Sequence, residues 1–388
     1  MRERPAGRAR RPAPPGIGLT WAAVALVGVR ALVVGAVVLD PPTADPWLRR
    51  AETIASSPAR PYRDFPLALG PLEAGAIRAL GGDGVAATAG RLAVLALAAD
   101  LAVAALLGRT WGRRVGVAYL AVGLPLVGVA YLRTDLVAVA LAVGALAALR
   151  ARADAGAGAV LGAAVGWKIW PLALLPALRH RPRALGWFSA TLAVVGLAWY
   201  AWGGPRGPLQ VLTGRGALGW SVESPIGAAL WLVGRGATIL EAGAIRFGVV
   251  PWWARALLGL GLLATLAAIW RPALAGGAGA ARDPRSARDP AALPALGATA
   301  ALALFAPVAP VLHAAWLAPW VARCWDDADG RAAALLGTWA IALSGVLALR
   351  TGRWDALQVA LALGRGALLL ALVAATLRGQ RFGSERAR

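Results

Sequence analysis

Carboxylates and arginines follow the first long apolar stretch of the chain, and they are the residues best suited to chemistry. The segment from Asp40 to Glu52 reads Asp-Pro-Pro-Thr-Ala-Asp-Pro-Trp-Leu-Arg-Arg-Ala-Glu. A carboxylate near cations can deprotonate an acceptor hydroxyl while the cations hold an anionic leaving group. Asp45 and Asp40 are therefore candidate general bases of a transferase or hydrolase. The alternative is that the whole segment after the first apolar stretch is a solvated loop without a catalytic role. In that case Pro-Tyr-Arg-Asp at 61–64, further along the same loop, simply forms a turn.

Lys168 is the second candidate, because it is the only lysine of the chain and lies within the apolar run 155–178. An ammonium at bilayer depth costs about 2.5 to 3.5 kcal/mol on insertion scales, so an intramembrane cation is a candidate for binding an anion. The alternative is a lysine whose ammonium reaches from a helix end to the membrane interface.

A third group of candidates lies further along the chain, where Arg215 is followed by Trp220 and Glu223. An arginine, a carboxylate and a tryptophan again stand close together in sequence. Because tryptophan also belongs in the interfacial belts of membrane proteins, this group is open to a purely structural interpretation as well.

The elements that must position these residues are membrane helices. The 388-residue chain is 59% hydrophobic and contains repeated apolar stretches of the length that crosses a bilayer as helix. We therefore expect an all-α, polytopic integral membrane protein. The net charge of +21 does not predict nucleic-acid binding, because the arginines form clusters between apolar runs. One cysteine excludes an intramolecular disulfide, and no spacing of thiols or histidines predicts a metal site.

The arginine clusters predict the topology, because basic residues gather on the cytoplasmic side of membrane proteins. Both termini are then cytoplasmic, with a basic arm at 1–16 and a basic tail at 378–388. Residues 17–377 form one transmembrane domain with external loops at about 40–83 and 203–251. The clusters are Arg2–Arg11, Arg109–Arg114, Arg150–Arg152, Arg179–Arg183, Arg271–Arg288 and Arg378–Arg388.

This topology fixes the expected spans and keeps residues 65–82 outside as an interfacial helix. The segment around Lys168 has basic clusters at both ends, so it should enter and leave on one side as two half-helices that break near residues 166–171. A single span with one misplaced cluster is the alternative. The other spans are expected at about 17–39, 85–107, 185–202, 252–269, 291–305, 311–321, 332–349 and 356–375.

Several of these pieces, in order, resemble the polyprenyl-phosphate-dependent mannosyltransferases of glycosyltransferase family 87, which have the GT-C membrane fold. The resemblance covers about residues 20–325, and its most specific part is Pro-Tyr-Arg-Asp-Phe-Pro at 61–66. The other matching pieces are Asp45, Ala51-Glu52, Arg133-Thr134-Asp135-Leu136, the glycine-rich run 162–176 with Lys168, Pro171 and Leu172, Arg215-Gly216 and Glu223-Ser224-Pro225.

The chain also departs from the family pattern. Where family members continue Glu-Tyr-Pro-Pro after Phe-Pro-Leu, this chain has Ala-Leu-Gly-Pro at 68–71. Near Trp316, the family's Ser-Pro-Gln-Tyr is replaced by Pro-Val-Leu-His at 310–313. The early aspartate of the family stands about two residues further upstream of Ala-Glu than Asp45 does.

The resemblance implies a GT-C bundle of about 10 to 12 transmembrane or half-membrane helices. It implies transfer of a hexose, expected to be mannose, from a polyprenyl-phosphate donor to a cell-envelope glycolipid or glycan by inverting displacement. The lipid-linked sugar phosphate is a substrate, and no cofactor or metal is expected. Asp45 or Asp40 would be the base, and Lys168, Arg215 and Arg63 would bind the donor phosphate. Contacts to sugar or acceptor would come from Glu223, Asp64, Tyr62, Trp220, Asp135 and His313.

The expected setting is the outer face of a bacterial plasma membrane. One alternative is a transporter or flippase of an anionic lipid, in which a broken helix carrying Lys168 binds substrate at the midplane. The sequence argues against a transporter, because it shows one broken helix, whereas transporters often have a pair of broken helices in corresponding halves. An inactive GT-C relative is the other alternative, and His313 could also be a helix-end residue with a satisfied hydrogen bond.

Overall fold

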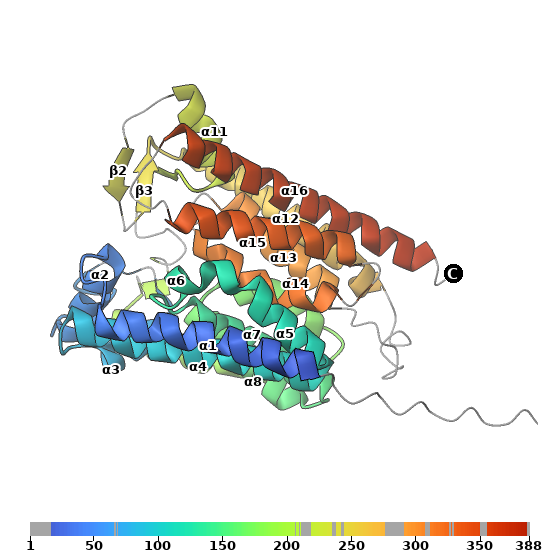
Figure 1. Ribbon diagram of the computed structural model, residues 1–388, viewed down its shortest axis with the longest axis horizontal. Coiled ribbons are helices and arrows are strands. Elements are labelled where there is room, and N and C mark those ends of the chain that lie inside the picture. The colour runs from blue at the N-terminus through green and yellow to red at the C-terminus, as the bar shows by residue number, and fades with distance from the viewer. Residues whose placement is uncertain are drawn as a thin grey trace, which may run out of the picture.

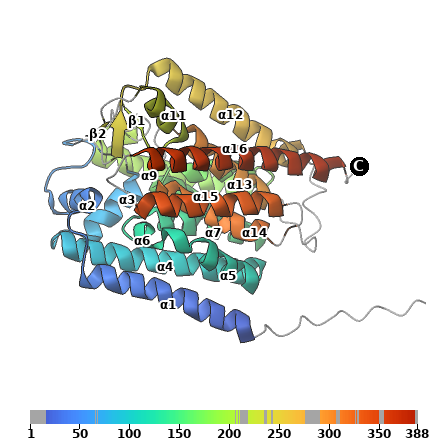
Figure 2. The same cartoon turned by 45° about the horizontal axis from the view of Figure 1, so that its top comes forward.

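The computed structural model describes residues 17–65, 67, 69–205, 207, 208, 210, 219–234, 238–241, 244–275, 291–306, 311–325, 327, 330–349 and 355–385. Within this part, seven helical segments are long and apolar enough to cross a membrane. They run side by side along the length of the molecule (Figure 1, Figure 2). The seven are α1 (Ile17–Leu39), α4 (Val85–Trp111), residues 113–130, α9 (Pro182–Gly203), α12 (Trp252–Ala275), α15 (Arg331–Leu349) and α16 (Ala356–Glu385).

These helices confirm the predicted multi-pass helical membrane protein. The bounds of α1 are those expected from the sequence, and α9 and α15 differ from expectation by a few residues at most. Shorter helices pack among the long ones, including α7 (Asp135–Arg150), α8 (Asp154–Trp167) and α13 (Ala292–Phe305). The expected total of about 10 to 12 transmembrane or half-membrane helices stays a prediction.

Two membrane segments differ from the sequence-based expectation. The span at 113–130 had not been recognised, and it consists of α5 (Arg113–Val122), η1 (Leu124–Leu126) and α6 (Val127–Ala130). The segment 311–321 was expected to be one span, but it contains a short 3-10 helix, η4 (Val311–Trp316), and a short α-helix, α14 (Ala318–Cys324). Pro125 and Pro319 lie at these two interruptions, where a missing N–H prevents continuous helical bonding.

Helix α16 continues past the predicted start of the basic tail at residue 378, as far as Glu385. The boundary between membrane domain and tail stays a prediction. Residues 1–16 and 386–388, and the part of the Arg271–Arg288 cluster from residue 276 onward, lie outside the part of the chain that the structure describes.

Both predicted external loops contain regular structure at the end of the bundle where α1 ends. The first contains α2 (Pro46–Ser56) and α3 (Pro71–Leu80), in agreement with the expected interfacial helix. The second contains α11 (Pro225–Gly234) and three short antiparallel strands in the order β1-β3-β2. This small sheet is an addition to the predicted helical fold, and its aromatic and β-branched residues favour strands. The strands are β1 (Trp220–Ser221), β2 (Thr238–Glu241) and β3 (Ala244–Phe247).

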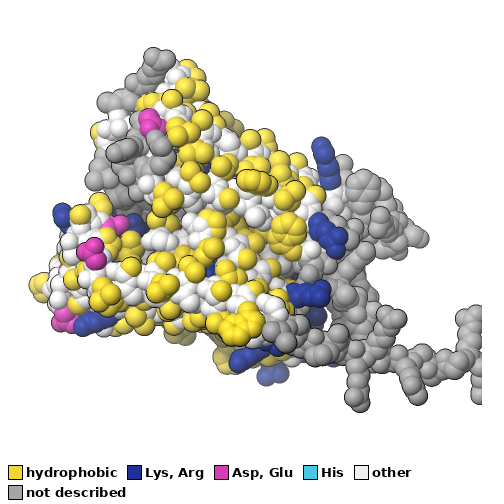
Figure 3. Space-filling view, in the orientation of Figure 1, with side chains coloured by type: hydrophobic (Ala, Val, Ile, Leu, Met, Phe, Trp, Pro, Cys, Tyr) yellow, Lys and Arg dark blue, Asp and Glu magenta, His cyan; other side chains and the backbone are white. Residues whose placement is uncertain are grey.

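Charge distinguishes the two ends of the molecule (Figure 3). In this view the acidic side chains lie at the end with α2 and the sheet, where a few basic side chains accompany them, and only basic side chains are seen at the opposite end, where α16 ends. The surface between the two ends is mainly hydrophobic. This distribution fits helices that cross the membrane along the long axis of the molecule.

Glycines of α8 explain why the segment before Lys168 is rich in that residue. Gly158, Gly162 and Gly166 recur every four residues, so they share one face of the helix. A Cβ at Gly158 would lie 2.0 Å from the Ala184 carbonyl oxygen of α9, and a Cβ at Gly162 would lie 2.8 Å from Thr191. Small residues thus let α8 and α9 approach closely, as is usual between membrane helices.

Arg30 helps to attach α1, a largely exposed helix, to the bundle. Its Nε lies 2.7 Å from Oδ2 of Asp100 in α4, and Nη2 donates to the Leu120 carbonyl at 2.7 Å. The hydroxyls of Tyr119 and Tyr131 also donate to Asp100. An intramembrane arginine paired in this way satisfies its donors without contacting lipid. The pairing explains how the apolar helix α1 can contain a charged residue.

Candidate functional site

The predicted break in the helix is confirmed, and Lys168 lies at it. Helix α8 ends at Trp167, Lys168 is extended with φ −140° and ψ 143°, and a 3-10 helix, η2 (Trp170–Leu178), follows. Pro171 stands at the start of η2, where its ring prevents α8 from continuing. The break therefore releases the Lys168 side chain from the regular helix surface.

Lys168 pairs with two carboxylates from different elements. Its Nζ lies 2.8 Å from Oε1 of Glu73 in α3 and 3.7 Å from Oδ2 of Asp135 at the start of α7. Glu73 can come so close because Gly70 precedes α3: a Cβ at Gly70 would lie 2.3 Å from the Trp167 carbonyl oxygen. Helix α3 thus contacts the break directly.

Glu73 is completely buried and is bound unequally at its two oxygens. The Thr134 hydroxyl donates to Oε1, whereas Oε2 has no hydrogen-bond partner within the described residues. Burial raises the pKa of Glu73 above its usual value and the nearby Asp135 carboxylate adds to the increase, while the Lys168 ammonium and the Thr134 hydroxyl oppose it. Two carboxylates around one ammonium favour a proton on one of them.

Aromatic side chains close the site on the side of η4. The Trp316 indole Nε1 donates to Oδ1 of Asp135 at 3.1 Å. The Trp316 ring stacks on His313 at a centroid distance of 3.8 Å and on Trp170 at 5.1 Å. Nδ1 of His313 is buried with no hydrogen-bond partner in the described part of the chain. The hydrogen bond expected of a helix-end histidine is thus not found at Nδ1 among the residues that the structure describes.

Asp45 lies at the N-terminus of α2 and uses both carboxylate oxygens. Oδ1 accepts hydrogen bonds from the backbone N–H groups of Trp47 and Leu48 at 2.8 and 3.0 Å, so Asp45 is the N-cap of α2. Oδ2 lies 3.1 Å from Nη2 of Arg133, whose guanidinium also lies 5.0 Å from the Trp47 ring centroid. The Asp45 side chain remains 19% exposed, which leaves its carboxylate accessible to a ligand.

Three consecutive residues join these groups. Arg133 binds Asp45, Thr134 binds Glu73, and Asp135 binds Lys168 and Trp316. The indole of Trp167 further donates to the Thr134 carbonyl at 3.2 Å. The segment that opens α7 therefore connects the external helices with the break, and it places the predicted residues Asp45, Asp135, Lys168 and His313 in one region.

Glu223 links the second external loop to the same region. Its Oε2 accepts the backbone N–H of Val311 at 3.0 Å, two residues before His313. Arg365 of α16 donates to the Glu223 carbonyl oxygen. Burial raises the pKa of Glu223, while the nearby Arg365, the Val311 hydrogen bond and the charge of Arg133 oppose the increase. Glu223 thus fixes the start of η4.

The motif at residues 61–66 has a structural role in the described residues. Tyr62 is buried with a left-handed φ of 68°, and its hydroxyl donates to the Leu69 carbonyl at 2.7 Å. Asp64 accepts the Arg60 N–H at 2.6 Å, which closes a turn. Arg63 and Asp64 are exposed. This local geometry is that of the turn considered as the alternative.

Three further predicted residues lie apart from this region or outside the description. Asp40 is exposed at the end of α1. Trp220 is buried in a small apolar cluster with Val222 and Phe247. Arg215 lies outside the residues that the structure describes.

Three residues that complete the region around Lys168 were not predicted from the sequence as site residues: Glu73, Arg133 and Arg365. Glu73 and Arg365 are isolated charges in apolar helices, and such charges usually have a buried partner. An isolated charge in an apolar helix thus indicates that a partner exists, but it does not identify that partner. Among the described residues, no group of three histidine, cysteine or carboxylate side chains is arranged to hold a metal.

Glu52, which belongs to the Ala-Glu piece of the resemblance, caps α4. It accepts from the N–H groups of Gly82 and Gly84 at 3.1 and 2.9 Å and from the Thr88 hydroxyl. Burial raises the pKa of Glu52, but these three donors outweigh that effect and leave it below its usual value. The carboxylate thus holds α2 against the start of α4.

We expect Glu52→Gln to lower the unfolding temperature near pH 7, because the charged acceptor is lost. A depressed folded-state pKa stabilises the protein above the ordinary glutamate pKa of about 4.3, and this contribution disappears as pH falls through the folded pKa. The difference from the unsubstituted protein should therefore shrink below about pH 4. Heating with a thiol-reactive dye measures unfolding through the buried Cys324. A difference that is constant with pH contradicts the assigned role.

Two comparisons with known proteins identify no relative of this chain. A scan against protein-family models finds no match, and a search of curated proteins finds no similar sequence.

Proposed function

We propose that this protein is a membrane glycosyltransferase that moves a hexose, mannose by the sequence resemblance, from a polyprenyl-phosphate donor to a cell-envelope glycolipid or glycan. The observation that carries the proposal is the pairing of Asp45 with Arg133 at the N-terminus of an external helix, joined through residues 133–135 to the Lys168 break. A carboxylate and a cation in contact offer both a base for an acceptor and a partner for a phosphate.

The reaction is a single displacement. The acceptor oxygen attacks the anomeric carbon, the bond from that carbon to the phosphate oxygen breaks, and its electron pair leaves on the phosphate. The acceptor proton moves to Oδ2 of Asp45. In the structure, the Arg133 guanidinium is paired with this oxygen. A donor phosphate that attracts the guanidinium would free Oδ2 to accept the proton. Oδ1 stays occupied as the cap of α2 and fixes the direction of the carboxylate.

The cations of the region suit a donor that carries negative charge. The Arg133 guanidinium lies at Asp45, and the Lys168 ammonium lies between Glu73 and Asp135. These two cations are the ones that a donor phosphate would meet in this region. A sugar joined to a lipid phosphate is a phosphodiester with a single negative charge. Lys168, Arg63 and Arg215 stay assigned to the phosphate, and Arg133 joins them.

A second candidate function, transport or flipping of an anionic lipid, is favoured by one observation. The sequence suggested a single broken segment, but η4 and α14 form another interruption, and its Trp316 contacts Asp135 and Trp170 beside the first break. The number of broken segments therefore does not count against a transporter. Broken helices that meet at a charged residue also occur in transporters.

Transfer of radiolabelled mannose from polyprenyl phosphate tests the two proposals. Membranes containing the protein should move label into envelope glycolipid, and membranes without it should not. Label that crosses a vesicle bilayer on an unchanged donor, with no transfer, favours the flippase. Neither transfer nor translocation, with donor binding intact, favours an inactive relative.

The proposed site faces outward in a bacterial plasma membrane, with both termini inside. In a Cys324→Ser background, we expect cysteine at Ser56 in α2 to react with a membrane-impermeant maleimide in intact cells. Cysteine at Arg109, at the opposite end of α4, should react only after permeabilisation. The reverse pattern contradicts the orientation.

A further inference from the structure

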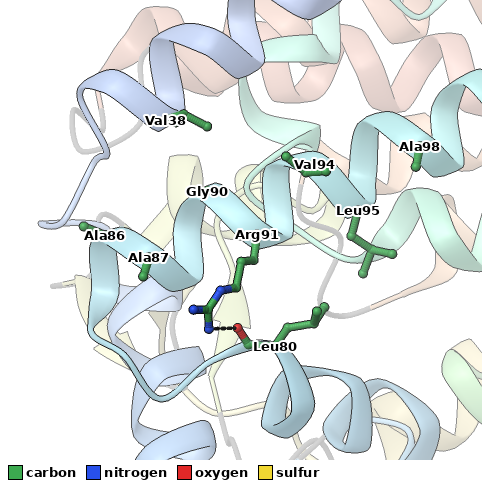
Figure 4. Close-up of a pocket in the computed structure, with 9 residues that line it drawn as sticks. All are labelled: Val38, Leu80, Ala86, Ala87, Gly90, Arg91, Val94, Leu95 and Ala98. Atoms are coloured by element: carbon green, nitrogen blue, oxygen red, sulfur yellow. Dashed lines mark hydrogen bonds between the residues drawn. The ribbon is translucent and has the colours of Figure 1, made fainter.

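A groove of about 770 Å³ opens between the outer ends of α1, α3 and α4, away from the residues proposed for transfer (Figure 4). Its lining is apolar except for Arg91. The other lining residues include Val38 of α1, Leu80 at the end of α3, and Gly90, Val94 and Leu95 of α4.

Small side chains on α4 create this space. Ala86, Ala87, Gly90 and Ala98 all line the groove, and a Cβ at Gly90 would be 3.7 Å from Val38 Cγ2. The groove lies between two helices that are long and apolar enough to span the membrane. An apolar groove on that surface meets hydrocarbon rather than water, so a lipid chain is its natural occupant.

One end of the groove carries two opposite charges. The Arg91 side chain lies across the space between α4 and α3, where Nη1 donates to the Leu80 carbonyl at 2.9 Å (Figure 4). Nη2 forms an ion pair with Asp83. The two side chains are 44% and 64% exposed, so both are accessible from outside the protein.

Arg91 also lies at a suitable depth. It follows the first residue of α4, Val85, by about 9 Å of helix. Helical side chains lean toward the N-terminus, and arginine extends its charged group to the membrane surface. The apolar part of the groove continues inward from this point along Val94 and Ala98.

We propose that this groove binds a phospholipid with a zwitterionic amine headgroup, such as phosphatidylethanolamine. One acyl chain fills the groove, the lipid phosphate binds Arg91, and the lipid ammonium binds Asp83. Exposed ion pairs are weak, so the Arg91 and Asp83 side chains separate at little cost to accept the two headgroup charges. A purely anionic headgroup satisfies Arg91 but leaves Asp83 without a cation, so it binds less well.

Titration of the purified full-length protein with phosphatidylethanolamine or phosphatidylglycerol in detergent, read by native mass spectrometry, tests the proposal. We expect phosphatidylethanolamine to bind at least about tenfold more tightly. Arg91→Gln and Asp83→Asn should each remove this preference. Gly90→Leu, which occupies the groove, should reduce binding of both lipids.

Matched controls lie elsewhere on membrane helices. Arg109→Gln removes an exposed arginine at the opposite end of α4, and Gly186→Leu adds a leucine to α9 at a glycine with open space around it. Both should retain the lipid preference. Equal binding of the two lipids by the unsubstituted protein overturns the headgroup assignment. Unchanged binding in Gly90→Leu, or equal loss in Gly186→Leu, overturns the groove as the site.

Discussion

Replacing Asp45 with asparagine is expected to lower the rate of sugar transfer about 10² to 10⁴-fold, the usual effect of removing a general base. The substitution retains an oxygen that can accept the N–H groups of Trp47 and Leu48, so α2 keeps its cap. The loss should therefore appear in kcat, with little change in unfolding temperature. Transfer of radiolabelled sugar by membranes containing each variant, at matched protein amounts, provides the measurement.

Asp40→Asn is the matched control, because Asp40 is an exposed carboxylate only five residues upstream. It should change the rate much less than Asp45→Asn. Full activity of the Asp45 variant together with loss in the Asp40 variant moves the base upstream. Full activity in both variants rules out a single base in this loop.

Arg133 explains why this test needs a second readout. Asn at 45 also weakens the contact with Arg133, so the guanidinium becomes available to bind phosphate more tightly. A lower KM for the donor together with a much lower kcat is therefore the expected combination. A merely structural role for Asp45 predicts instead a lower unfolding temperature and a proportional loss of active protein.

Local patterns in the sequence were sufficient to predict the long helices and the break at Lys168. Long apolar runs such as that of α1, and the proline three residues after Lys168, act over short distances in sequence and need no knowledge of the fold. The second interruption, between η4 and α14, was missed because residues 311–321 are apolar throughout apart from His313. Hydropathy does not distinguish a continuous helix from two short ones.

The partners of the site residues could not be predicted in the same way. Glu73 meets Lys168 across 95 positions because Gly70 allows α3 to touch the end of α8, and that contact depends on packing in three dimensions. Likewise, Asp45 and Glu52 both follow the first span, yet Glu52 caps α4 while Asp45 pairs with Arg133. Residue type identified the candidates, and tertiary contacts assigned their different roles.

The second large effect concerns Lys168. Lys168→Met should lower the free energy of unfolding by about 3 to 5 kcal/mol, because it leaves the buried carboxylates of Glu73 and Asp135 without their cation. Arg181→Gln is the control, since Arg181 and Asp154 form a more exposed pair that should contribute only about 0 to 1 kcal/mol. Reaction of Cys324 with a thiol dye during heating, for each variant in the same detergent, measures the loss.

The double variant Lys168→Met/Glu73→Gln separates stability from donor use. Removing one negative charge together with the ammonium should recover most of the lost stability, because an uncharged amide can remain buried beside Thr134 with its hydrogen bond intact. If the double variant is as unstable as Lys168→Met, the ion pair is not the cause of the loss. Donor use can be measured in the double variant without the complication of unfolding. We expect the donor KM of the double variant to rise, because Lys168 is one of the proposed phosphate cations. A normal donor KM in a stable double variant would show that Lys168 serves only to neutralise buried carboxylates. Arg133 would then be the cation nearest the base.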